Sequence, residues 1–237
     1  MSQLLTLVTR VLREPRDLIA DSDTAEGVAR LALPTLLVAA VGAALLGAVC
    51  GSYRGGIQIA FAAVKMPALF LVPLLVALPA VHALYAACGV RVTWSRLSAA
   101  ALVGVARTGV LAAAMSPVLW LYYSVHPGYH RSVLVFALAV VLVGLPGLVT
   151  LVRALPAGGA LRLAATLGSI LIIGTSMAQS GWLLRPFVAR PTVEVAFLRP
   201  VEEDIVSALV YTNLSAVDHY PGWDARSDGA IGNWSEE

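Results

Sequence analysis

Five long apolar segments dominate the chain, at about residues 31–51, 67–88, 97–123, 132–152 and 161–184. A helix needs roughly 20 apolar residues to cross the hydrocarbon core of a bilayer, and each segment meets that length. The pattern therefore predicts an all-α fold, a polytopic helical membrane protein with about five transmembrane helices.

The second segment has an irregular start. Residues 55–64 are apolar but too short to cross a bilayer, and Lys65-Met-Pro67 follows them. We expect an interfacial or re-entrant piece there, ahead of the second span. Pro73 and Pro79 interrupt that span and predict a kinked helix, because each proline frees a backbone carbonyl. His82, near its end, is expected to lie at a helix interface and not to act as a ligand.

The N-terminal residues 1–26 form a separate segment. Apolar residues at helical spacing, interleaved with arginines, predict one amphipathic helix over residues 1–20. Such a helix lies either on the membrane surface or against the protein's own loops, and the pattern favours neither. Asp23-Thr-Ala-Glu26 reads as a capping box at the start of the next helix. The transmembrane domain then covers residues 27–187.

Residues 188–237 are predicted to be an acidic tail outside the membrane. Nine carboxylates lie from Glu194 onward, against Arg199 and Arg226. Pro200 and the acidic residues after it suit the first turn of a helix. From Tyr220 the tail is rich in glycine, aspartate and serine, and we expect its last part to be disordered.

Composition supports the membrane assignment. Hydrophobic residues make up 59% of the chain and charged residues 13%, with a mean hydropathy of +0.82, whereas soluble domains carry about a quarter charged residues. Residues 27–193 contain no aspartate or glutamate. Proton- and sodium-coupled carriers usually need carboxylates within the membrane, so their absence counts against such a carrier.

The distribution of arginines predicts the location and orientation. The abundance of alanine and the preference for arginine over lysine indicate a bacterial protein of the inner, cytoplasmic membrane. With the N-terminus in the cytoplasm, the inner segments hold most of the basic residues, as the positive-inside rule requires. The tail would then lie outside, although three arginines after the fifth span oppose this orientation.

Two spans carry small residues at regular spacing. Small residues every fourth position let another helix backbone approach closely, so these faces are predicted to be packing faces. They also offer a route to a protein partner or a homo-oligomer. The residues are Ala39, Ala43, Gly47 and Gly51 in the first span, and Ala100, Gly104 and Thr108 in the third.

Three cations are candidates for an anion or lipid-headgroup site. Arg107 lies close to the middle of the third span, where an arginine costs about 2.5–3.5 kcal/mol on insertion scales. It either binds an anion or headgroup, or extends its side chain to the membrane surface, or indicates that the span lies a few residues from the predicted position. Lys65 and Arg185 are the other two candidates, and Trp182 with Arg185 resembles an aromatic belt residue followed by a cation.

The chain shows no pattern of catalytic chemistry. His126 and His130 flank a Pro-Gly turn, which prevents them from binding a metal as an i, i+4 pair on one helix. We therefore interpret this segment as a hydrated loop at the membrane interface. No nucleophile–base spacing, phosphate loop or zinc pattern is present. We therefore predict no catalytic residue, no cofactor, no metal and no nucleic-acid partner, and a protein that is not an enzyme. Cys50 and Cys88 fall at opposite membrane faces and cannot pair.

Two short stretches resemble known membrane-protein families. Leu12-Arg-Glu-Pro-Arg16, followed by a five-span body, resembles the start of bacterial Yip1-like membrane proteins, with Glu14 in place of the usual Asn. Gln179-Ser-Gly-Trp-Leu-Leu-Arg-Pro-Phe187 looks like a signature of uncharacterised bacterial membrane proteins sometimes grouped with them. The resemblance implies a five-helix integral membrane protein concerned with membrane organisation or partner assembly, and it brings no catalytic residue.

Two functions are consistent with these features. The first is a non-enzymatic scaffold or accessory subunit of a membrane complex, indicated by the packing faces and the acidic tail. The alternative is a transporter or permease subunit for an anionic solute or lipid, indicated by Arg107, Lys65 and the proline-rich second span. With either function, the protein lies in the lipid bilayer and contacts its lipids.

Overall fold

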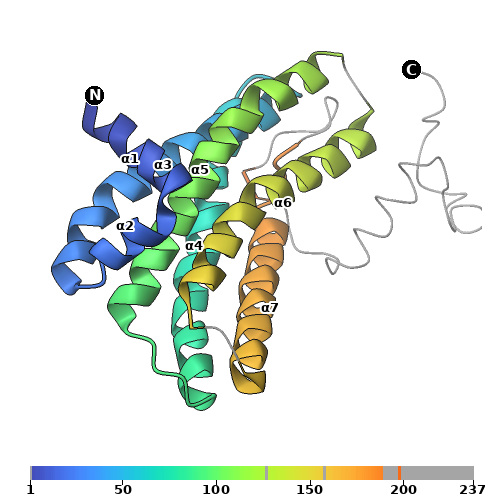
Figure 1. Ribbon diagram of the computed structural model, residues 1–237. Helices are drawn as coiled ribbons and strands as arrows, with labels where there is room; N and C mark the ends of the chain where they lie inside the picture. Colours follow the sequence, from blue (N-terminus) through green and yellow to red (C-terminus); the bar gives the residue numbers. More distant parts are fainter. Residues whose placement is uncertain (1, 126–127, 157–158, 189–196, 199–237) are drawn as a thin grey trace, which may run out of the picture.

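A computed structural model describes residues 2–125, 128–156, 159–188 and 197–198 (Figure 1). These residues form helices and no strands, and five of the helices are long and apolar enough to cross a membrane. The predicted all-α membrane fold is thereby confirmed. The helices are α1 Ser2–Arg13, α2 Pro15–Asp21, α3 Ala25–Ser52, α4 Gln58–Ala87, α5 Trp94–Ser124, α6 Tyr129–Ala154 and α7 Ala160–Leu183.

The five long helices pack in the order α7, α4, α3, α5 and α6 and form an incomplete ring. Helix α3 packs on both α4 and α5, α6 packs on α5, and α7 packs on α4. Helices α6 and α7 make little contact with each other. Short helices α1 and α2 lie at one side of the bundle, beside α3 and α5 (Figure 1). The bundle has two ends. Helices α3, α5 and α7 begin at one of them, which we call the α1–α2 end. We call the other one the opposite end.

Glycines set the distance between α3 and its neighbours. A Cβ atom added to Gly42 would lie 1.9 Å from the carbonyl oxygen of Gly109 in α5. One added to Gly47 would lie 2.3 Å from the carbonyl oxygen of Ala62 in α4. Real Cβ atoms do not approach so closely, so the backbones are in direct contact and only glycine fits. The first small-residue stripe is therefore used for packing within the chain.

The contact between α5 and α6 is built in the same way. A Cβ atom on Gly104 would lie 2.8 Å from the carbonyl oxygen of Gly147, and one on Gly147 would lie 2.2 Å from Thr108 Oγ1. Beside this contact a cavity of about 50 Å³ lies between α4, α5, α6 and α7, lined almost entirely by apolar side chains. Gly144, Ile173 and Met177 form part of its wall where α6 and α7 fail to meet.

The N-terminal segment packs on the protein itself. Val11, Leu18 and Ile19 are buried in one cluster with Ala99 and Val103 of α5. These three residues pack on α5, whereas Leu4 and Leu5 of α1 are largely exposed, so part of the apolar face of the segment stays uncovered among the described residues. The single helix predicted over residues 1–20 is wrong, since the chain forms two helices with Pro15 as the first residue of α2. Proline is favoured at that position because it lacks an N–H group.

Two other boundaries differ from the prediction. Helix α4 is continuous from Gln58, so residues 55–64 are not a separate interfacial piece. Both polar residues of its first two turns, Gln58 and Lys65, are buried with partners inside the protein, which removes the need for an interfacial position. The N-cap of α3 is Thr24, whose Oγ1 accepts a hydrogen bond from the backbone N–H of Gly27 at 3.0 Å. Asp23 does not cap the helix and bonds elsewhere.

Candidate functional site

The chain folds back into the bundle after α7. Residues 186–188 are buried at the opposite end, and Phe187 and Val188 belong to the same apolar cluster as Leu46, Cys50 and Tyr123. We call Pro186, Phe187 and Val188 the C-terminal plug. The ring of Phe187 stacks on that of Phe136 in α6, with 5.1 Å between centroids. The plug therefore joins the end of α7 to α3, α5 and α6.

Two polar side chains of α4 hold the plug. Gln58 Nε2 donates hydrogen bonds to the carbonyl oxygens of Pro186 at 3.0 Å and Phe187 at 3.1 Å. Lys65 Nζ donates to the carbonyl oxygen of Pro186 at 3.2 Å. Both side chains are fully buried, and backbone carbonyls outside a helix need such donors in an apolar environment. The arrangement supplies hydrogen-bond donors for the carbonyl oxygens of Pro186 and Phe187.

Lys65 carries a positive charge into the interior of the bundle. Its residue is 1% exposed, and its Nζ atom lies 4.8 Å from the centre of the Phe197 ring. Phe197 also contacts Phe61 edge to face at 5.1 Å. The face of an aromatic ring attracts an ammonium group that lies over it. Among the described residues, therefore, a carbonyl oxygen and an aromatic ring stabilise this lysine.

Arg185 lies directly before the plug in the chain and is partly buried. Its guanidinium carbon lies 3.5 Å from the centre of the Trp182 ring, a close cation–π contact. The two residues contact each other directly, and their position at the membrane surface stays a prediction. Arg185 and Lys65 are brought to the same end of the bundle, because both adjoin Pro186.

Arg107 lies elsewhere, at the contact between α5 and α6. Its Nη1 atom donates a hydrogen bond to Thr150 Oγ1 of α6 at 3.0 Å. The hydroxyl of Thr150 in turn donates to the carbonyl oxygen of Pro146 at 2.8 Å. Arg107 is near the middle of its own helix, but Thr150 is only four residues from the end of α6. The guanidinium therefore lies closer to the α1–α2 end than its position in α5 indicates.

His82 is part of a polar contact at the α1–α2 end. Its Nε2 lies 3.1 Å from the carbonyl oxygen of Val92, which requires a proton on that nitrogen. The ring stacks on Trp94, with 4.1 Å between centroids. His82 thus ties the last turns of α4 to the start of α5, in agreement with the interface role predicted for it.

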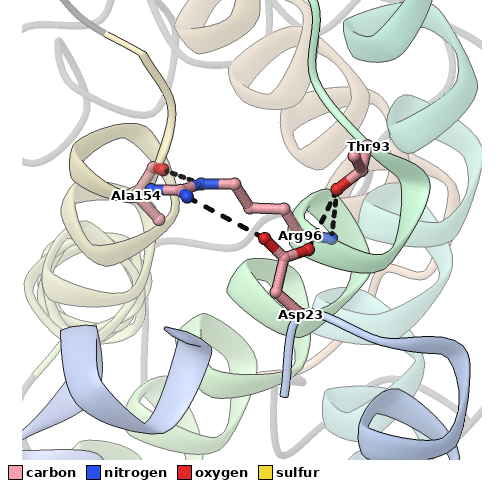
Figure 2. A network of polar contacts seen from close by, with 4 residues as sticks. All are labelled: Asp23, Thr93, Arg96 and Ala154. Atoms are coloured by element: carbon pink, nitrogen blue, oxygen red, sulfur yellow. Dashed lines mark hydrogen bonds and ion pairs between the residues drawn. The ribbon is translucent and has the colours of Figure 1, made fainter. Parts of the chain in front are cut away.

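Figure 2 shows a four-residue network at the same end of the bundle. Asp23 accepts a hydrogen bond from Thr93 Oγ1 at 2.9 Å and pairs with Arg96 Nη1 at 3.9 Å. Arg96 Nε donates to the carbonyl oxygen of Ala154 at 2.9 Å. The network joins the start of α3, the start of α5 and the end of α6. It explains why Asp23 is not the N-cap, since its carboxylate bonds to α5 instead.

The predicted packing residues all lie at helix contacts within the chain. Ala39 and Ala43 are buried in the cluster that contains Leu46, and Ala39 meets Gly109 of α5. A Cβ atom on Gly51 would lie 2.5 Å from the carbonyl oxygen of Gln58. Ala100 is buried beneath α1 and α2. Gly47, Gly104 and Thr108 form the contacts described above, so these faces are occupied by helices of the same chain.

The described residues contain no group of three His, Cys, Asp or Glu side chains that could hold a metal ion. His126 lies outside the described residues, as do the predicted tail helix after Pro200 and the region expected to be disordered. Cys50 and Cys88 are both unpaired cysteines. The arrangement of the described side chains thus offers buried hydrogen-bond donors and cations.

Sequence reasoning missed several of the residues that hold the site. Gln58, Pro186 and Phe187 act through an amide and two backbone carbonyls, and backbone groups leave no side-chain pattern. A polar residue at the start of an apolar segment was the one available signal for Gln58. Thr150 was missed because a threonine in an apolar span is common.

Comparisons with protein-family models, with curated proteins and with solved structures find no match for this chain. The resemblance to Yip1-like membrane proteins, based on Leu12–Arg16 and Gln179–Phe187, therefore stays a prediction.

Proposed function

We propose that the protein is a non-enzymatic scaffold or accessory subunit of a membrane complex, which binds a membrane-spanning helix through the outer face of α7. This α7 face consists of exposed residues, several of them small or polar, in the half of α7 nearer the opposite end. They are Leu171, Gly174, Thr175, Ala178 and Gln179.

The observation that carries the proposal is the difference between Gly174 and the glycines of α3. Gly42, Gly47 and Gly51 each meet the backbone of a neighbouring helix, whereas a Cβ atom on Gly174 would meet nothing within 4 Å. Glycine costs about 1 kcal/mol relative to alanine inside a helix. In membrane helices that cost is offset where another backbone approaches closely. Gly174 carries that cost and has no such neighbour among the described residues.

Polar side chains on the same face support the proposal independently. Gln179 and Thr175 are exposed and make no hydrogen bond from their side chains within the described residues. A side-chain amide without a partner is unfavourable in hydrocarbon. Polar residues of a second helix relieve that cost by hydrogen bonding across the contact.

The permease alternative has less support from the geometry. Lys65 is bonded to the plug at the opposite end, and Arg107 is bonded to Thr150 nearer the α1–α2 end. The two cations are therefore at different helix contacts and do not converge on one solute. The scaffold or accessory role is the proposal that the described contacts favour.

Extraction into lipid nanodiscs followed by native mass spectrometry tests this function. We expect the wild-type protein to be released in a complex of defined stoichiometry, either with a partner protein or with a second copy. Ala178→Leu should abolish the complex, because a larger side chain keeps the second backbone away. Ala114→Leu is the matched control, since Ala114 is also exposed but lies on α5. A lone wild-type protomer, or a complex that Ala178→Leu leaves intact, would contradict the proposal.

A further inference from the structure

Arg107 has more hydrogen-bonding capacity than the protein uses. Its Nη1 atom bonds to Thr150 Oγ1, while its Nε atom is shielded and has no hydrogen-bond partner within the described residues. A guanidinium presents five N–H donors in a planar fork. One bond to a hydroxyl therefore orients the group and leaves most of its donors for another ligand.

The charge of Arg107 is also unbalanced within the described residues. Residues 27–193 contain no carboxylate, and the described ion pairs all involve acidic residues between Asp21 and Glu26. Three arginines already use those carboxylates, namely Arg10, Arg30 and Arg96. A cation in a membrane domain needs a partner such as an anion, water or a headgroup.

The depth of Arg107 follows from its neighbours. Thr150 is four residues before the last residue of α6, which corresponds to about 6 Å along the helix axis. Ala106, the residue before Arg107, is buried in the cluster formed with α1 and α2. Leu4 and Leu5 of α1 are exposed, and exposed apolar residues of an amphipathic segment lie at the boundary between headgroups and acyl chains. The guanidinium is thus within reach of the headgroup layer at the α1–α2 end.

We propose that Arg107, oriented by Thr150, binds a phosphate-bearing anion at the α1–α2 end of the contact between α5 and α6. Arginine pairs with phosphate oxygens through charge-assisted hydrogen bonds. The occupant would be the headgroup of an anionic phospholipid or a soluble phosphate, which share this chemistry. The site is independent of the α7 face, which lies on another helix and in the other half of the bundle.

Native mass spectrometry of the full chain with defined lipids tests the site. The protein is transferred from detergent into phosphatidylcholine nanodiscs with or without phosphatidylglycerol, and retained lipid is counted. Loss of a charged hydrogen bond typically weakens binding about tenfold. We therefore expect Arg107→Gln to retain about tenfold less phosphatidylglycerol than wild type. Arg153→Gln is the control, because Arg153 is an exposed arginine at the end of α6.

Further variants separate charge from geometry. Arg107→Lys keeps the charge but loses the planar fork, and should retain an intermediate amount of phosphatidylglycerol. Thr150→Val removes the orienting hydroxyl and should also weaken retention. A shift in melting temperature with inorganic phosphate, absent in Arg107→Gln, would support the site and assign it to a soluble anion. Equal lipid retention in wild type, Arg107→Gln and Arg107→Lys, without any effect of phosphate, would overturn the proposal.

Discussion

Lys65 donates a hydrogen bond to the backbone carbonyl of Pro186, 121 residues further along the chain. Gln58, two turns earlier in α4, donates to the same oxygen. These bonds close the opposite end of the helical bundle, because the segment after α7 is drawn in between α3, α5 and α6. A buried lysine and a buried glutamine thus donate hydrogen bonds to the backbone carbonyls of a segment that is not helical.

Replacing Gln58 with leucine should loosen the C-terminal plug. Leucine has a similar size but donates no hydrogen bond, so the carbonyl of Phe187 loses the donor it has in the wild type. A buried polar group without a partner costs about 1–3 kcal/mol. We expect a lower melting temperature in detergent. We also expect about tenfold faster alkylation of Cys50, which shares a buried cluster with Phe187.

The alkylation experiment uses a Cys88→Ala background, so that Cys50 is the single thiol. Gln179→Leu is the matched control, because it removes an exposed amide from α7. It should leave the alkylation rate unchanged. An equally slow rate in Gln58→Leu and wild type would show that the bonds from Gln58 do not hold the plug.

Two glycine-to-alanine substitutions should have opposite effects on stability. A Cβ atom on Gly42 would lie 1.9 Å from the carbonyl oxygen of Gly109, so Gly42→Ala must push α3 and α5 apart. Overpacking of this kind costs about 1–3 kcal/mol. A Cβ atom on Gly144 meets nothing within 4 Å, so Gly144→Ala should be neutral or stabilising by up to about 1 kcal/mol. Thermal unfolding in one detergent compares them, and a loss of stability in both variants would contradict the packing described.

The fold was predictable because the residues of each span are themselves apolar over a sufficient length. The apolar length of the five segments is a local property, and it identified all five long helices. The start of α4 was not predictable in this way. Lys65 looks like a boundary in the sequence, but it is buried because Pro186 supplies an acceptor. Tertiary structure alone decides whether a lysine ends a span or lies inside it.

The candidate site was only partly predictable. Lys65, Arg107 and Arg185 stand out as cations among apolar residues, and the sequence identifies them. Their partners do not stand out, because Pro186 contributes a backbone oxygen and Thr150 a common hydroxyl. Asp23 and Thr24 are both good capping residues. The choice between them depends on Thr93 and Arg96, which lie about 70 residues away in the chain.

The N-cap of α3 offers a direct test of that choice. Thr24→Ala removes the acceptor for the backbone N–H of Gly27 and should destabilise the protein by about 1 kcal/mol. Thr24→Ser keeps the hydroxyl and should behave like wild type. Thermal unfolding in detergent measures both variants. If Thr24→Ala unfolds like wild type, the cap makes no contribution at this position.

Photo-crosslinking from α7 in native membranes tests whether a second membrane helix contacts the α7 face. A benzophenone is attached to the cysteine of Ala178→Cys, and separately to that of Ala114→Cys, in a background that lacks Cys50 and Cys88. We expect one crosslinked product of defined mass from position 178 and none from position 114, because a second helix contacts the α7 face. The same pattern from both positions, or no protein crosslink from position 178, would contradict it.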